Sequence, residues 1–317
     1  MDANTVQQVP LKTAARAKKK QSSYKQPWML HLMVLPAVLL VFVFSYLPMS
    51  GIVMAFQDYK SALGITGSPW VGLKHFRYMF ENEYFLQITW NTLFFACTKI
   101  VMNLVIPFIF ALLLNEVRNT GLKRSIQTLV YLPHFLSWVI LAGILIDLLG
   151  QTGLVNQMLS HVFGIKPIFF LGDGNWFRFT IIFSDVWKEF GFNTIVFLAA
   201  LAGINPALYE AAEVDGASRL KQSFHITIPS LVPVIVVIGT LALGNVMNAN
   251  FDQVFNLYSP LIYQQGDIID TFVYRQGLLS GQFSFATAVN LFKSMISLIL
   301  IVTSYRLAYR VAGYRIF

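Results

Sequence analysis

Polar and aromatic side chains gather at the end of one long apolar run. The sequence ALGNVMNANFDQVF holds Asn245, Asn248 and Asn250 beside Phe251, Asp252 and Phe255. Amides both donate and accept hydrogen bonds, and aromatic rings can stack on the apolar faces of sugars. We therefore expect this group to bind a hydroxyl-rich solute, with Asn245 and Asn248 on one helix face because they are three residues apart. Amides also bond between helices in membrane bundles, and that alternative stays open.

Two further apolar runs carry polar side chains. Tyr131 and His134 flank Pro133, where a helix is expected to kink. The sequence WKEFGFNT contains the second group, which is Glu189, Phe192 and Asn193. Polar residues inside membrane-spanning helices are costly and usually face a cavity or another helix.

Two lysines, Lys99 and Lys293, lie in the middle of apolar runs. A lysine at such a place can snorkel toward the membrane surface, pair with an acid or line water. The sequence does not decide among these three.

Catalytic motifs are missing from the sequence. A phosphate-binding loop needs G-x-x-x-x-G-K-[S/T], and this chain contains no Gly-Lys pair. It has no HExxH or CxxC pattern, and its five histidines are scattered singly. A membrane enzyme would need a reactive acid, histidine or cysteine at the interface, and only isolated candidates exist. We predict no catalytic residue, no metal site and no cofactor in this chain.

Composition indicates that these polar groups are positioned by membrane-spanning helices. The 317 residues are 56% hydrophobic and 12% charged, whereas a soluble domain carries roughly 25% charged residues. A spanning helix needs about 20 apolar residues. We predict an all-α polytopic membrane protein with six spans, at residues 28–49, 91–114, 126–149, 179–202, 231–250 and 288–309.

The distribution of basic residues predicts the orientation of these spans. Segments 1–27, 115–125, 203–230 and 310–317 together contain thirteen lysines and arginines, and segments 50–90, 150–178 and 251–287 contain six. Positive charge marks the cytoplasmic side, so both termini should be cytoplasmic. The basic tail at 1–27 is better explained as an orientation signal than as a nucleic-acid-binding segment. The outer segments mix aromatics with glycine and proline, which suits short interfacial elements.

One patterned polar interval interrupts the apolar sequence at 205–229. Asn205 can cap a helix and Pro206 fits the first turn, so a short helix should follow as far as Asp215. Gly216 stands where a helix commonly ends in a left-handed residue, and Ser218 can begin a second helix that runs toward Pro229. The interval predicts a helix–turn–helix outside the membrane.

The residues of this interval resemble the cytoplasmic EAA loop of ABC-importer permeases that work with a binding protein. The family pattern is roughly E-A-A-x-x-D-G-A, then an aromatic residue, then I-x-L-P. The chain matches it with Glu210, Ala211, Ala212, Asp215, Gly216, Ala217, Phe224, Ile226 and Pro229, and departs from it with Ile228 in place of leucine. Residues 91–317 resemble the five-helix core of type I permeases, and 28–90 resembles the extra first helix and outer segment of sugar-type permeases. The outer sequence SPWVGLKHF is similar to the subgroup for oligo- and polysaccharide fragments.

The resemblance implies a function and a set of partners. The chain would be one permease subunit in a bacterial cell membrane, paired with a second permease that is either a paralogue or a second copy; sugar-type permeases with the extra first helix typically pair with a different permease, so we expect a paralogue. Two ATPase subunits would bind ATP and Mg²⁺, and an extracytoplasmic binding protein would deliver the sugar. Glu210, Ala211, Ala212, Asp215, Gly216 and Ala217 would form the ATPase-docking element. By similarity to maltose-type permeases, the sugar-site candidates are Tyr131, His134, Glu189, Phe192, Asn193, Asn245, Asn248 and Asn250.

A self-sufficient secondary carrier of a small polar solute is the alternative function. It predicts an internal repeat or a coupling-ion site with broken helices, and neither is found in the sequence.

Overall fold

The computed structural model describes residues 27–312. These residues fold into helices joined by turns, and the one bridge of extended backbone among them pairs Gln57 with Trp70. The chain divides into two compact units, Met1–Ser50 and Gly51–Phe317. The predicted basic tail at 1–27 lies almost wholly outside the described residues.

Apolar helices long enough to cross a membrane recur along the described chain. Five such segments are Trp28–Phe56, Glu83–Asn115, Trp138–Phe163, Arg219–Gly244 and Phe283–Arg306. A sixth is formed when α9 (Gly174–Ala202) and α10 (Pro206–Val214), which meet at a bend of 68°, are counted as one. Such helices satisfy every backbone polar group internally, as a bilayer requires. The prediction of an all-α polytopic membrane protein is confirmed.

The described residues of the first unit form a single helical segment. It contains α1 (Pro27–Val41), the π-helical turn η1 (Phe42–Tyr46) and α2 (Leu47–Met49). The 3₁₀ turn η2 (Ser50–Phe56) continues the helix into the second unit, so the predicted span at 28–49 extends to Phe56. The side chains from Trp28 to Ser50 are exposed and most are apolar, which suits contact with lipid.

Three predicted spans begin earlier than the apolar pattern indicated. Helix α5 (Glu83–Asn115) begins before residue 91 because the Asn82 side chain accepts a bond from the Tyr84 amide at 3.0 Å. Helix α9 begins before residue 179 because Asp173 caps its first turn. Helix α16 (Phe283–Ala312) likewise begins before residue 288. A capped first turn can be polar, so hydropathy alone misses it.

The prediction of one span at 126–149 is wrong. This stretch contains α6 (Thr120–Tyr131), the 3₁₀ turn η3 (Leu132–Phe135) and α7 (Trp138–Leu149). Pro133 has no amide hydrogen to continue α6, and the extended Ser137 caps α7 through a bond from the Ile140 amide at 3.3 Å. The kink expected at Pro133 is therefore a complete break between two helices.

The predicted fifth span at 231–250 begins and ends too late, because the observed apolar helix covers Arg219–Gly244. Helix α12 (Ile228–Gly244) ends at Asn245, where the backbone enters a turn, and α13 (Phe251–Leu257) begins a new helix. Asparagine side chains compete with the helical backbone for hydrogen bonds and favour turns. Three asparagines in six residues therefore end the helix that the apolar pattern would continue.

Short helices occupy the predicted outer segments. They are α3 (Gly64–Gly67), α4 (Lys74–Glu81), α8 (Leu154–Phe163), α14 (Tyr263–Gly266) and α15 (Ile269–Val273), with the π-helical turn η6 (Tyr274–Leu279) before α16. Their interfacial placement in a membrane stays a prediction.

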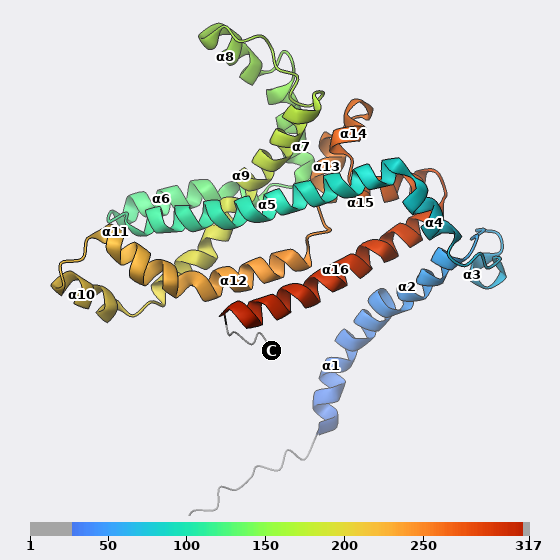
Figure 1. Cartoon of the computed structure of the whole chain (residues 1–317), viewed down its shortest axis with the longest axis horizontal. Helices are drawn as coiled ribbons and strands as arrows, with labels where there is room; N and C mark the ends of the chain where they lie inside the picture. The colour runs from blue at the N-terminus through green and yellow to red at the C-terminus, as the bar shows by residue number, and fades with distance from the viewer. Residues whose placement is uncertain (1–26, 313–317) are drawn as a thin grey trace, which may run out of the picture. The chain divides into compact units, whose positions relative to one another are not determined.

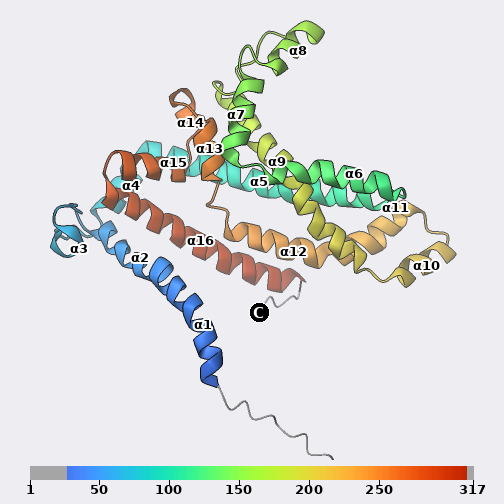
Figure 2. The ribbon, with the colours of Figure 1, turned by 180° about the vertical axis from the view of Figure 1, so that it is seen from behind.

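The helices of the second unit pack in pairs. Helix α5 packs against α9, which crosses it obliquely, and α12 lies beside α16 (Figure 1). Viewed from behind, α6 packs on α9 (Figure 2). Gly191 of α9 allows this last contact, because a Cβ atom there would lie 2.0 Å from the Val130 carbonyl oxygen. The pairs enclose apolar cores such as the one around Phe95, Phe177 and Ile181.

Candidate functional site

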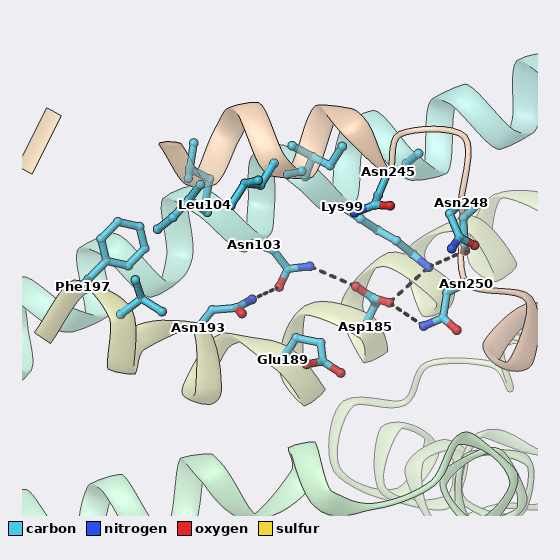
Figure 3. Close-up of a pocket in the computed structure, with 17 residues that line it drawn as sticks. Lys99, Asn103, Leu104, Asp185, Glu189, Asn193, Phe197, Asn245, Asn248 and Asn250 are labelled. Atoms are coloured by element: carbon cyan, nitrogen blue, oxygen red, sulfur yellow. Dashed lines mark hydrogen bonds and ion pairs between the residues drawn. The ribbon is translucent and has the colours of Figure 1, made fainter. Parts of the chain in front are cut away.

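A cavity of about 420 Å³ lies between α5, α9, the end of α12 and the loop before α13 (Figure 3). Its apolar walls come mainly from α5, α9 and α12, and polar side chains are concentrated on one side. The polar lining residues are Lys99, Asn103, Asp185, Glu189, Asn193, Asn245, Asn248 and Asn250. One cation, two acids and five amides can together donate and accept many hydrogen bonds.

Asp185 is the centre of a buried cluster in this wall. Its carboxylate lies 3.2 Å from Lys99 Nζ and accepts bonds from Asn103 at 3.0 Å and Asn250 at 3.3 Å. Figure 3 shows these four side chains converging from α5, α9 and the loop before α13. We call Lys99, Asn103, Asp185 and Asn250 the Asp185 cluster. Both ion-pair side chains are only 8% exposed.

The structure decides between the alternatives for the two mid-span lysines. Lys99 pairs with Asp185 and also donates to the Ala249 carbonyl at 3.1 Å and to Gln253 Oε1. Lys293 pairs with Asp270. A buried charge is tolerated when it is paired and hydrogen-bonded, so both lysines pair with acids, and Lys99 also lines the cavity.

Asn250 holds an unusual backbone conformation. Its φ of 70° is positive, which no other described residue except glycine shows. The Asn250 side chain accepts a bond from the Gln253 amide at 3.4 Å and so caps α13, while its amide group donates to Asp185. Strained backbone of this kind is retained where the surroundings over-determine it. Asn250 thus ties the start of α13 to α9.

The structure brings five of the eight sugar-site candidates to the cavity. These are Glu189, Asn193, Asn245, Asn248 and Asn250. The expectation that Asn245 and Asn248 share a helix face is wrong, because α12 ends at Gly244 and the Asn248 amide donates to the Asn245 carbonyl in a turn. Both still line the cavity because the turn folds over it.

Two other candidates lie next to the cavity rather than in its wall. His134 Nδ1 is 2.7 Å from Glu189 Oε2, and the imidazole stacks on Phe192 with ring centroids 4.0 Å apart. Lys188 donates to the other Glu189 oxygen at 2.8 Å and to the His134 carbonyl at 2.9 Å. Glu189 and Lys188 of α9 therefore bind His134, which lies between α6 and α7.

Tyr131 is the remaining candidate. It ends α6 on the side that approaches Gly191 and does not line the cavity.

Sequence reasoning missed Asp185, Asn103 and Lys188 as site residues. Asp185 and Lys188 could have been found, since both are charged residues within the predicted span at 179–202 and such residues usually face a functional interior. Asn103 could have been found by the weaker form of the same rule, since it is an amide within the predicted span at 91–114. Within residues 27–312, no group of three or more histidines, cysteines and acids could hold a metal ion.

A second candidate region is the 205–229 segment at the other end of the helices. The Asn205 side chain caps α10 by accepting from the Ala207 amide at 3.1 Å, and α10 ends at Asp215. Gly216 has a φ of 73°, so the predicted left-handed turn is present. Ser218 precedes α11 (Arg219–Gln222), and the helix continues through the π-helical turn η4 (Ser223–Thr227) into α12. The predicted second helix is therefore the start of a span.

Few contacts hold this segment, and its apolar side chains point outward. Tyr209 bonds to Thr227 at 2.8 Å and Gln222 donates to the Ala217 carbonyl at 3.2 Å. Val214 is 89% exposed, and Leu208, Leu220 and Phe224 are exposed as well. Helix α10 lies at one end of the bundle in both views (Figures 1 and 2). The segment thus presents an apolar, rigidly capped surface.

Both regions lie largely within a match to a known protein family. Residues 103–312 match the family model described as "Binding-protein-dependent transport system inner membrane component". This match includes most of the cavity wall and the whole 205–229 segment.

Two relatives from Bacillus subtilis (strain 168) are similar over most of their length. The polygalacturonan/rhamnogalacturonan transport system permease protein YteP is 44% identical over 280 residues, which is 88% of this chain and 87% of YteP. Protein LplB is 41% identical over 293 residues, which is 92% of each chain.

Solved structures show the same fold. A chain in the crystal structure of a bacterial ABC transporter involved in the import of the acidic polysaccharide alginate matches with a TM-score of 0.85 and 38% identity, over 90% of this chain and 97% of that one. A second structure shows a bacterial alginate ABC transporter in complex with a periplasmic protein that holds an alginate pentasaccharide. Its matching chain has a TM-score of 0.85 and is 37% identical in sequence. The chain belongs to the binding-protein-dependent inner membrane component family and is a multi-pass permease subunit of an ABC importer.

Proposed function

We propose that this chain forms one half of the translocation pathway for an oligosaccharide or polysaccharide fragment. The amide-rich cavity supports this substrate class, because amides match the donors and acceptors of sugar hydroxyls. The names of the similar polygalacturonan and alginate transporters point to the same class. Glu189, Asn193, Asn245, Asn248 and Asn250 are the proposed contacts, with Lys99 and Asp185 holding the wall.

Partner subunits complete the proposed transporter. A second permease, which we take to be a paralogue, would form the other half of the pathway, and an extracytoplasmic binding protein would deliver the saccharide. Two ATPase subunits would bind ATP and Mg²⁺. The chain would lie in a bacterial cell membrane. The distribution of basic residues favours an orientation with both termini and the 205–229 segment on the cytoplasmic side.

One observation supports a role in coupling transport to ATP hydrolysis by a partner. The α10–Gly216–α11 element is exposed, in a chain whose sequence has no phosphate-binding loop. Energy must then come from another protein, and this element offers the docking surface. Glu210, Ala211, Ala212, Asp215, Gly216 and Ala217 are the proposed docking residues. Small side chains allow close approach, and the left-handed glycine sets the angle between the two helices.

Gly216→Pro tests the coupling role directly. Proline cannot adopt a φ of 73° and removes the amide that donates to the Glu213 carbonyl, at a cost of about 3 kcal/mol or more. In the reconstituted transporter, saccharide-stimulated ATP hydrolysis should fall at least about tenfold. Gly164→Pro is the matched control, because Gly164 also ends a helix with a positive φ but lies at the end of α8.

Ala212→Trp tests the same surface without a backbone change. Ala212 borders a cleft of about 270 Å³ between α10 and the α11–η4 segment, together with Ala217, Gln222 and Ile226. An indole there should separate the two helices and lower stimulated hydrolysis, whereas Ala212→Ser should not. Unchanged coupling in both Gly216→Pro and Ala212→Trp would refute the docking role.

Saccharide transport by the purified chain alone would instead indicate a self-sufficient carrier.

A further inference from the structure

Five aromatic rings form a continuous row beside the cavity. Phe251 stacks on Phe255 with centroids 5.0 Å apart, and Tyr274 lies 5.0 Å from Phe255. Tyr258 follows at 6.0 Å from Phe255, and Tyr263 lies 5.3 Å from Tyr258. These rings come from α13, from Tyr258 directly after it, from α14 and from η6, so folding assembles the row from separate segments. We call it the aromatic row.

The row begins where the cavity ends. Asn250 lines the cavity and caps α13, and Phe251 is the first residue of that helix. Seven residues of α13 rise about 10 Å along the helix axis, so the rings of the row are spread over a length of that order, starting one residue after the cavity lining. A saccharide that leaves or enters the cavity on this side would meet these rings next.

A buried ion pair holds the far end of the row. Arg275 lies over the Tyr263 ring at 4.2 Å and the Tyr258 ring at 5.7 Å. Its guanidinium donates to both oxygens of Asp267, whose side chain is fully buried and also accepts from Tyr84 and Thr271. Because Asp267 neutralises Arg275, the end of the row offers oriented rings and no net charge. Burial raises the pKa of Tyr258, so its ring stays uncharged at neutral pH.

All five rings are only partly buried. A ring packed in a core is covered on every side, whereas each of these keeps accessible surface. Saccharide sites combine such ring surfaces with a few polar groups that orient the ligand, and Asn248, Asn250 and the tyrosine hydroxyls supply polar groups here.

We propose that the aromatic row is a saccharide-binding track that continues from the cavity and holds successive sugar rings of a long substrate by stacking. The proposal rests on the proposed function, because it takes the saccharide as the occupant. It assigns Phe255, Tyr258, Tyr263 and Tyr274 to sugar units that the cavity does not reach. The track then favours longer oligomers and selects on sugar-ring faces rather than on carboxylates, since its arginine is already paired.

Substrate length separates the track from the cavity. In the reconstituted transporter, uptake of galacturonic-acid oligomers of two and five units is measured for Phe255→Leu and Tyr274→Leu. The ratio of KM for the pentamer to KM for the dimer should rise about tenfold, since one aromatic contact contributes that order of affinity.

Phe179→Leu and Phe183→Leu are the matched controls. These rings also stack, at 5.6 Å, and both are exposed on α9 outside the cavity lining. Equal KM ratios in wild type, the row variants and the controls would overturn the track while leaving saccharide transport intact. Loss of the second permease from the purified row variants would also overturn it, because the rings would then be a subunit interface. Failure of the wild-type transporter to take up any saccharide would refute the proposed function itself.

Discussion

The 205–229 segment and the cavity wall are both polar, but their hydrogen bonds span very different distances along the chain. In the segment, Asn205 bonds two residues away and Gln222 five residues away, and the longest bond joins Tyr209 to Thr227 across 18 residues. In the wall, Asn103 and Asp185 are 82 residues apart, and Asn250 and Asp185 are 65 apart. The segment is therefore organised by neighbours in sequence, and the wall by distant helices.

The two regions also differ in how deeply their ion pairs are buried. The Arg219–Glu213 pair of the segment is more than half exposed on each side, whereas the Lys99–Asp185 pair is 8% exposed. Exposed pairs contribute little because water screens them, and a buried pair costs much when only one partner is removed. We therefore expect substitutions in the wall to change stability strongly and substitutions in the segment to change mainly the interaction with other proteins.

Lys99→Met should have the largest effect on stability. It leaves Asp185 buried with only the Asn103 and Asn250 amides, a loss of about 3–5 kcal/mol. We expect a lower melting temperature of the purified transporter. The double variant Lys99→Met/Asp185→Leu should recover much of the lost melting temperature, because no unpaired buried charge remains. A single variant as stable as wild type would show that the pair does not hold the wall.

Gly191→Ala should have the next largest effect. The added Cβ would lie 2.0 Å from the Val130 carbonyl oxygen and force α6 away from α9, which typically costs about 1–3 kcal/mol. Gly239→Ala in α12 is the matched control, because no atom lies within 4 Å of its added Cβ. Melting temperatures that fall equally in both variants would argue against a close contact at Gly191.

Asn205→Ala should have a smaller and local effect. It removes the N-cap of α10, worth about 1 kcal/mol, and hydrogen exchange should accelerate in the first turn of α10 while the amides of α9 stay protected. Asn205→Asp retains the capping oxygen and should exchange like wild type. Faster exchange throughout α9 would mean that the segment is not an independent local unit.

Arg219→Ala should have the smallest effect. Its pair with Glu213 is exposed at 3.4 Å, so the stability change should stay within about 0.5 kcal/mol. A shift in melting temperature as large as that of Lys99→Met would remove the distinction between the two regions.

Local rules predicted what depends on neighbouring residues. The Asn205 cap, the left-handed Gly216 and the short α10 helix follow from residue types within a few positions of one another. The existence of long apolar helices follows equally from hydropathy. Their ends were less accurate, because Asn82 and Asp173 cap polar first turns that hydropathy does not count.

The candidate site was predicted only in part, because its contacts join residues that are far apart in the sequence. The amides at 245–250 were identified as polar groups in an apolar run, yet the helix that should carry them ends at Gly244. Lys99 was recognised as costly, but its partner Asp185 lies in another helix and no local pattern joins the two.

By itself, the sequence determined a multi-pass helical membrane protein, its family and the local structure of its 205–229 segment, because hydropathy, capping and turn preferences act over a few residues. Only the tertiary structure decided which charges pair, that Asn250 closes on Asp185, and that rings from α13, α14 and η6 form one row. These contacts join residues far apart in the chain. They exist because buried charges and amides must find partners wherever the packed helices place them.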